Sequence, residues 1–239
     1  MAYTADNLER FGAQNALYPS LGPFNKQLQA CRRRSTIDGR PFILASRLID
    51  WLRSPVDDPN ASTNAGRILN EVYPRSDELD PKMRTRLLSF SDDSNSKCWL
   101  RIVTILLQMP AYLRSFAEII KIFHELGISD LKLPIDKQDT NITRQLKNFV
   151  FTSQATTDFI NEFDRLQWEL VCDKAFDEDH IDGYPHPHLG MILPVTGKEC
   201  TKQGGQGAIF MIEVPAECLP QTLSEKMRRK PYAKDDGSV

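Results

Sequence analysis

Residues 97–127 read KCWLRIVTILLQMPAYLRSFAEIIKIFHELG, the most apolar part of the chain. The part up to Gln108 is apolar on nearly all sides, which predicts a helix that is buried on most of its faces. Pro110 interrupts the pattern. From Ala111 to Leu126, apolar residues recur every three or four positions, which predicts an amphipathic helix capped at Gly127. Two such helices joined at a proline predict a helical hairpin as the core of a helical domain.

Helical patterns extend outward from this core in both directions. A stripe of apolar residues from Phe42 to Leu52 predicts a helix with Pro41 in its first turn, ended by Ser54 and Pro55. Residues 57–64 are polar and predict a loop. Shorter patterns predict further helices near 24–33, 65–72, from 80–81 onward, 142–150 and 153–170.

The pattern changes after a segment rich in Asp, Gly, Pro and His at 177–188, which predicts a linker. Two short apolar runs follow, Met191–Leu193 and Ala208–Val214, and both predict strands. Residues from 216 onward are polar and predict a poorly ordered tail. The expected organisation is a mainly α protein, with a helical domain at 1–176, a linker at 177–188 and a β segment at 189–239.

Composition narrows the classes of function. The chain has 239 residues, with 41% hydrophobic and 26% charged residues and a net charge of -2, so no overall field draws it to nucleic acid or to an anionic membrane. The basic runs at 32–34 and 226–230 are expected to be solvated surface. Five cysteines without Cys-x-x-Cys spacing indicate reduced thiols. With no secretory signal and no apolar run long enough to span a membrane, the expected location is cytoplasmic or nuclear.

A glycine cluster lies between the two predicted strands, in the sequence Lys202-Gln-Gly-Gly-Gln-Gly-Ala-Ile209. Glycine backbone can approach phosphate closely, and its N–H groups can bond phosphate oxygens. The cluster does not match a Walker loop, because no Lys-Ser or Lys-Thr follows, and a dinucleotide fold would place a helix after the glycines. A hairpin turn without a ligand and a phosphate-contacting loop both remain open.

A strand on each side of the glycines is the order found in protein kinases. The chain resembles, from about Arg47 to Val214, the N-terminal part of fungal proteins that carry a helical domain followed by a protein kinase domain. The resemblance rests on four stretches: Leu126–Pro134, Phe159–Phe176, Ile192–Pro194 and Gly204–Ile209. It implies that the β segment corresponds to the first strands of a kinase small lobe.

The resemblance also implies a nucleotide site for ATP with Mg²⁺. Gly204 and Gly207 would be the second and third glycines of the kinase loop, with Gly205 between them, and Ile209 would take the position that packs on adenine. Lys234, next to Ala233, would be the lysine that pairs with the phosphates. The chain departs from the family pattern at Lys202, where the first glycine belongs, and at Gln206, where an aromatic residue is usual.

Phosphoryl transfer needs an aspartate that orients the substrate hydroxyl and residues that hold Mg²⁺. The chain contains no His-Arg-Asp, Asp-Phe-Gly or Ala-Pro-Glu sequence, and its histidines give no metal site. We therefore expect a non-catalytic kinase-like protein, a helical module that binds a protein partner and carries a remnant glycine-rich loop. Two alternatives remain: the front part of an active ATP-dependent kinase, and a structural helical protein with no ligand.

Overall fold

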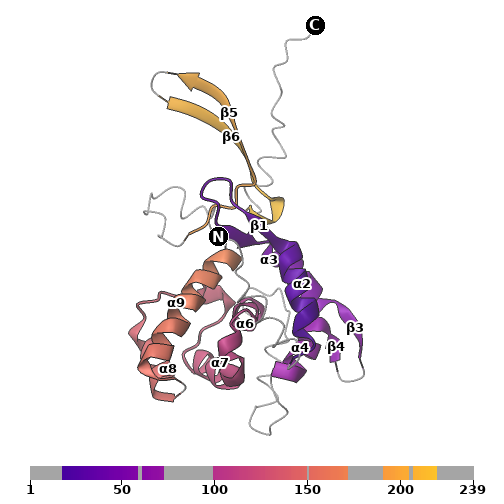
Figure 1. Cartoon of the computed structure of the whole chain (residues 1–239), viewed down its shortest axis with the longest axis vertical. Coiled ribbons are helices and arrows are strands. Elements are labelled where there is room, and N and C mark those ends of the chain that lie inside the picture. Colours follow the sequence, from indigo (N-terminus) through magenta and orange to yellow (C-terminus); the bar gives the residue numbers. More distant parts are fainter. Residues whose placement is uncertain are drawn as a thin grey trace. The chain divides into compact units, whose positions relative to one another are not determined.

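The computed structural model describes residues 18–58, 61–72, 99–149, 151–171, 191–204 and 207–219, and these are mainly α-helical (Figure 1). Within these residues the strands pair as β1–β2, β3–β4 and β5–β6, each pair a two-stranded sheet. The chain divides into two compact units. Of the described residues, the first unit contains 18–32 and those from 43 to 171, and the second contains 33–42 and 191–219. The predicted linker at 177–188 and the predicted boundary at 176 lie outside the described residues.

The first unit begins with three short helices and a hairpin. Their bounds are α2 Leu21–Cys31, α3 Ala45–Arg53, α4 Asn64–Val72, β3 Pro55–Asp58 and β4 Ala61–Thr63. Helix α4 confirms the helix expected at 65–72, and α3 ends before Pro55 as expected. The expected loop at 57–64 was wrong in part, because β3 and β4 occupy most of it and pair in antiparallel fashion.

The helix expected to start at Pro41 was also wrong at its beginning. Pro41–Ile43 form strand β2, which pairs with β1 (Arg32–Arg34), and the helix starts only at Ala45. Phe42 and Ile43 are fully buried. Helical spacing placed Phe42 on the apolar stripe correctly, but a buried strand satisfies the same residues, and Pro is compatible with the first position of a strand.

The core of the first unit contains α6 (Leu100–Leu107) and α9 (Ser153–Leu170), which pack against each other. Every residue of α6 except Arg101 is buried, which confirms the prediction of a helix buried on most faces. The amphipathic stretch after Pro110 forms a 3₁₀ helix, η1 (Pro110–Ser115), followed by α7 (Phe116–Glu125). The expected helical hairpin is thus interrupted by η1, and α6 has α9 as a main partner.

The backbone around Gly127 ends α7, and α8 then packs against its neighbours. Gly127 adopts φ 65°, and the N–H groups of Gly127 and Ile128 donate to the carbonyls of His124 and Phe123, the pattern of a Schellman cap. Helix α8 (Thr140–Phe149) packs against both α7 and α9.

An aromatic cluster joins these helices. The Phe159 ring lies 5.2 Å from that of Tyr112, 5.4 Å from Phe151, 5.9 Å from Phe163 and 6.5 Å from Phe123, between ring centroids. Phe159 is fully buried. Burial, and then the carboxylates of Glu162 and Asp158, raise the pKa of the Tyr112 hydroxyl above its ordinary value. The cluster makes Phe159 a central contact of the first unit.

The second unit combines the tip of the β1–β2 hairpin with a C-terminal segment. Its elements are β5 Gly197–Gly204, β6 Gly207–Glu213 and the 3₁₀ helix η4 Ala216–Cys218. The strand expected at Met191–Leu193 was wrong, because these residues form no regular structure. Hydrogen bonds hold the segment 191–195 instead: the Thr36 N–H and hydroxyl both donate to the Val195 carbonyl, and the Arg40 guanidinium donates to the Met191 carbonyl.

Candidate functional site

The glycine hairpin, β5 with β6, contains the predicted glycine loop. The strands are antiparallel, and Gly204 is paired with Gly207. The register slips between Cys200 and Lys202, a bulge that places Lys202 opposite Ile209. The expected order of strand, glycines and strand is therefore present, with Gly197–Gly204 rather than Met191–Leu193 as the first strand.

Lys198 and Glu199 lie on opposite faces of the glycine hairpin. Successive side chains of a strand point to opposite faces, so Phe210 and Ile212 share one face and Met211 lies on the other. Lys198, which is paired with Ile212, holds its Nζ 4.1 Å from the centre of the Phe210 ring. Glu199 is paired with Met211 on the opposite face.

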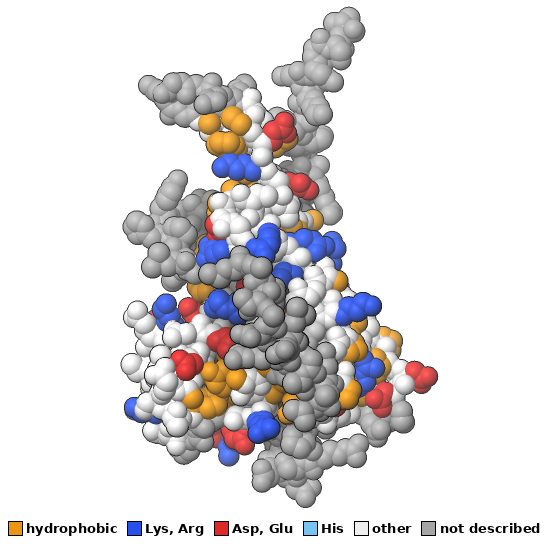
Figure 2. Space-filling model, in the orientation of Figure 1, with side chains coloured by type: hydrophobic (Ala, Val, Ile, Leu, Met, Phe, Trp, Pro, Cys, Tyr) orange, Lys and Arg blue, Asp and Glu red, His pale blue; other side chains and the backbone are white. Residues whose placement is uncertain are grey.

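Strand β6 exposes large apolar side chains to solvent. Ile209, Phe210, Met211 and Ile212 are 62%, 44%, 54% and 47% exposed. Hydrophobic side chains are visible at the surface of this hairpin in Figure 2. A two-stranded sheet cannot bury both of its faces by itself, so these residues are accessible for contact with a ligand or a partner.

Three of the five predicted site residues lie together in the glycine hairpin. Gly204 and Gly207 are opposite each other, and Ile209 follows two residues along β6, about 7 Å further on at the usual rise of a strand. Gly205 and Lys234 lie outside the described residues. Lys198 lies six residues before Gly204, about 20 Å away along β5, so its ammonium group is at the other end of the hairpin.

The described residues of the glycine hairpin can contact a ligand through backbone and apolar groups. Glycine N–H groups can bond phosphate oxygens, and the exposed Ile209 side chain can lie against a flat ring. Among the residues whose positions are described, no group of three or more His, Cys, Asp or Glu side chains could hold a metal ion. The same part of the chain contains no helix long and apolar enough to cross a membrane.

Two residues in the stretches on which the predicted resemblance to kinase proteins rests, Asp130 and Gln167, make hydrogen bonds within the helical unit. Asp130 accepts hydrogen bonds from the backbone N–H groups of Arg101 (2.9 Å) and Ile102 (3.0 Å), and thereby caps the start of α6. Gln167, fully buried on α9, accepts from the Ile135 N–H (2.7 Å) and donates to the Ile135 carbonyl (2.8 Å). Both side chains thus fasten the loop after Gly127 to the helices of the core.

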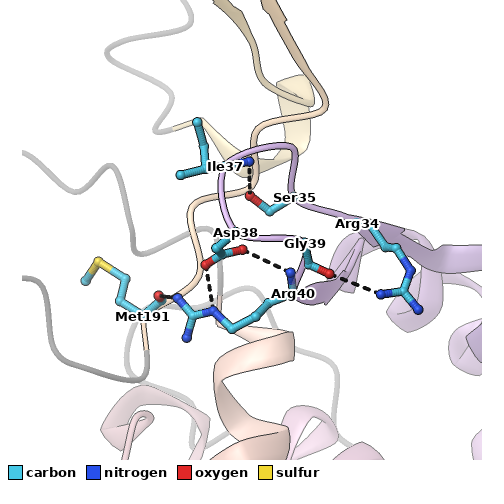
Figure 3. A network of polar contacts seen from close by, with 7 residues as sticks. All are labelled: Arg34, Ser35, Ile37, Asp38, Gly39, Arg40 and Met191. Carbon is cyan, nitrogen blue, oxygen red and sulfur yellow. Dashed lines mark hydrogen bonds and ion pairs between the residues drawn. The ribbon is translucent and has the colours of Figure 1, made fainter. Parts of the chain in front are cut away.

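A second polar cluster occupies the turn between β1 and β2 (Figure 3). The Asp38 carboxylate accepts from the backbone N–H of Arg40 (3.0 Å) and pairs with its guanidinium (2.6 Å). Burial alone would raise the pKa of Asp38, but the hydrogen bonds and the charge of Arg40 outweigh it and lower that pKa below its ordinary value. Gly39 adopts φ 71°, and its carbonyl accepts from the Arg34 guanidinium.

Sequence reasoning missed the strand β5 and the long-range hydrogen bonds of this turn, although Asp38-Gly39 does predict a turn. The residues between Gly197 and Gly204 are polar and show no apolar alternation, and the turn's bonds to 191–195 join positions about 150 residues apart. No family model, curated protein or solved structure matches the chain.

Proposed function

We propose that this chain is a non-catalytic kinase-like protein, in which a helical unit binds a protein partner and the glycine hairpin is a remnant of a kinase glycine-rich loop. The observation that carries the proposal is the register of the hairpin, with Gly204 opposite Gly207 and Ile209 exposed two residues later. In a kinase small lobe, a loop of this kind covers the phosphates of ATP between two strands.

The hairpin's role in this proposal is weak contact with Mg-ATP. Backbone N–H groups at the glycines contact the phosphates, and Ile209 contacts the base. The first glycine position of the motif is occupied by Lys202, which removes one point of close backbone approach. The chain has none of the sequences that orient the acceptor hydroxyl or hold Mg²⁺, and the proposed role is therefore nucleotide contact without phosphoryl transfer.

Two features support a protein partner. The helical unit has an apolar core of its own around α6 and α9, as an interaction module requires. Strand β6 of the glycine hairpin presents four successive exposed apolar residues, so the hairpin offers a partner a second surface beside that of the helical unit.

The same register also fits the front part of an active ATP-dependent kinase. Sequencing the transcript that encodes the chain separates the two readings. An open reading frame that continues past Val239 into His-Arg-Asp and Asp-Phe-Gly sequences would favour the active kinase.

Nucleotide contact is tested by titrating the isotope-labelled chain with Mg-ATP and following its backbone amide signals by NMR. We expect shifts confined to residues of β5 and β6, saturating in the millimolar range. The double variant Gly204→Val/Gly207→Val should abolish them, because the added side chains keep the backbone away from phosphate. Gly39→Asn, a change at another turn glycine of the second unit, is the matched control and should leave them intact. Absence of shifts in the hairpin of the native chain would leave a helical protein without this ligand.

A further inference from the structure

The turn between β1 and β2 contains a sequence that the proposed function does not use, Arg33-Arg34-Ser35-Thr36-Ile37. Two arginines precede Thr36 by two and three residues, and an apolar residue follows it. Arginine-directed Ser/Thr kinases select substrates by this charge pattern, since carboxylates in their peptide groove bond guanidinium groups in paired geometry. The same sequence offers Ser35 as a second acceptor, so the sequence alone does not choose between them.

The structure distinguishes the two hydroxyls. Ser35 is only 2% exposed, and its oxygen accepts a hydrogen bond from the Ile37 N–H (3.2 Å). Thr36 is exposed, and its hydroxyl donates to the Val195 carbonyl at 3.1 Å. Ile37 is 44% exposed, so the residue after the acceptor is accessible as well. Of these two residues, only Thr36 combines the charge pattern with an exposed position.

The arginines before Thr36 differ in how accessible they are to a kinase. Arg34 is exposed, and its guanidinium donates to the Gly39 carbonyl (3.1 Å) through Nη1. Arg33 is half-buried and has an interaction of its own in the folded chain, which a kinase would have to replace. Arg32, one residue further from Thr36, forms an ion pair of 2.8 Å with Glu169. Recognition therefore depends on Arg33 and Arg34, at three and two residues before the acceptor.

We propose that Thr36 is a phosphorylation site for an arginine-directed protein kinase. In this reaction the Thr36 Oγ1 attacks the γ-phosphorus of Mg-ATP, forming a new P–O bond. The bond from that phosphorus to the bridging β–γ oxygen breaks and ADP leaves, while the hydroxyl proton passes to the catalytic carboxylate of the kinase.

Phosphorylation changes the bonds of the turn. The phosphorylated oxygen has no proton to donate to the Val195 carbonyl, so one of the two bonds from Thr36 to that carbonyl is lost. The added phosphate, with nearly two negative charges, lies on the same turn as Asp38, which repels it, and Arg34 and Arg40, which attract it. We expect residues 191–195 to be held less firmly after modification.

The test uses the full chain, Mg-ATP and the catalytic subunit of cyclic-AMP-dependent protein kinase, with intact mass and peptide mapping as readout. We expect one phosphate, on Thr36. Thr36→Ala should prevent its addition there and Thr36→Ser should restore it, while Ser35→Ala should leave it unchanged. The double variant Arg33→Ala/Arg34→Ala should slow it at least tenfold, and circular dichroism checks that each variant is folded.

Two outcomes would overturn the proposal. One is a native chain that takes up no phosphate at Thr36 under conditions that fully modify an arginine-containing control peptide. The other is phosphate found on Ser35 with Thr36 unmodified, which would mean that the turn opens before the kinase acts. Faster hydrogen exchange at the Thr36 amide after modification would confirm that the contact with Val195 is weakened. Unchanged exchange would contradict the expected loosening of residues 191–195.

Discussion

Replacing Gln167 with alanine should destabilise the helical unit far more than the same replacement of an exposed polar residue. Gln167 is fully buried on α9 and makes two hydrogen bonds to the backbone of Ile135, one as acceptor and one as donor. Its amide also donates to the Asp164 carboxylate at 3.0 Å. Alanine removes all of these bonds at once and leaves the Ile135 N–H and carbonyl without their partner.

The expected cost follows from these bonds. A buried polar group left without a partner costs about 1–3 kcal/mol, and a typical hydrogen bond contributes about 1 kcal/mol net. Ile135 is half-buried, so water can replace part of the loss. We therefore expect Gln167→Ala to lower the free energy of unfolding by about 2–4 kcal/mol. For a unit of this size that corresponds to a fall of roughly 4–16 °C in Tm.

The assay is urea unfolding followed by circular dichroism at a helical wavelength. Gln154→Ala is the matched control, because Gln154 lies on the same helix, is exposed and bonds only the exposed Asp158 side chain among the contacts described. It should change stability by no more than about 0.5 kcal/mol. Gln167→Glu keeps the acceptor for the Ile135 N–H but removes the donor and buries a charge, so it should be at least as damaging as alanine at neutral pH. If Gln167→Ala unfolds at the same urea concentration as Gln154→Ala, Gln167 does not hold the loop as described.

Three further predictions concern other contacts. Asp130→Ala removes the cap of α6 and should lower the free energy of unfolding by about 0.5–2 kcal/mol. Asp130→Asn should be less damaging, because one acceptor oxygen remains. Urea unfolding measures both variants, and equal losses of stability would contradict the capping role. Phe159→Ala should cost about 3–5 kcal/mol in the same assay, whereas Phe210→Ala on the exposed hairpin should leave the helical transition unchanged; similar effects of the two would refute the core assignment. The Asp38–Arg40 pair should stabilise the β1–β2 turn above the ordinary carboxyl pKa of about 4 and lose that contribution as the pH falls through the lowered pKa of Asp38. NMR titration of the Arg40 amide measures this, and a midpoint at or above the ordinary value would contradict it.

The helices of the core could be predicted because their apolar residues recur at helical spacing. The all-round apolar character of α6 predicted its burial, and the glycine at 127 predicted the cap of α7. Spacing could not show that the stretch after Pro110 begins as a 3₁₀ helix, because both helix types place neighbours three or four residues apart on one face.

The strands, and the hydrogen bonds of Asp130 and Gln167 that hold the loop after Gly127, could not be predicted in the same way. Strand β5 is polar, and an exposed hairpin has no buried face to impose an alternating pattern on its sequence. The bonds of Asp130 and Gln167 join residues 28–32 positions apart, so they depend on the tertiary fold. Of the glycine loop, the order of strands and the location of Ile209 could be anticipated, but the register and the bulge could not.

The most direct test of the proposed role is hydrogen–deuterium exchange of the full chain with and without saturating Mg-ATP. A ligand that binds the folded hairpin must slow its opening by mass action. We predict slower exchange in residues 197–213, no change in α6, α7 and α9, and loss of the effect in Gly204→Val/Gly207→Val. Unchanged exchange across the hairpin would contradict the remnant nucleotide loop and leave protein binding by the helical unit as the function still to be tested.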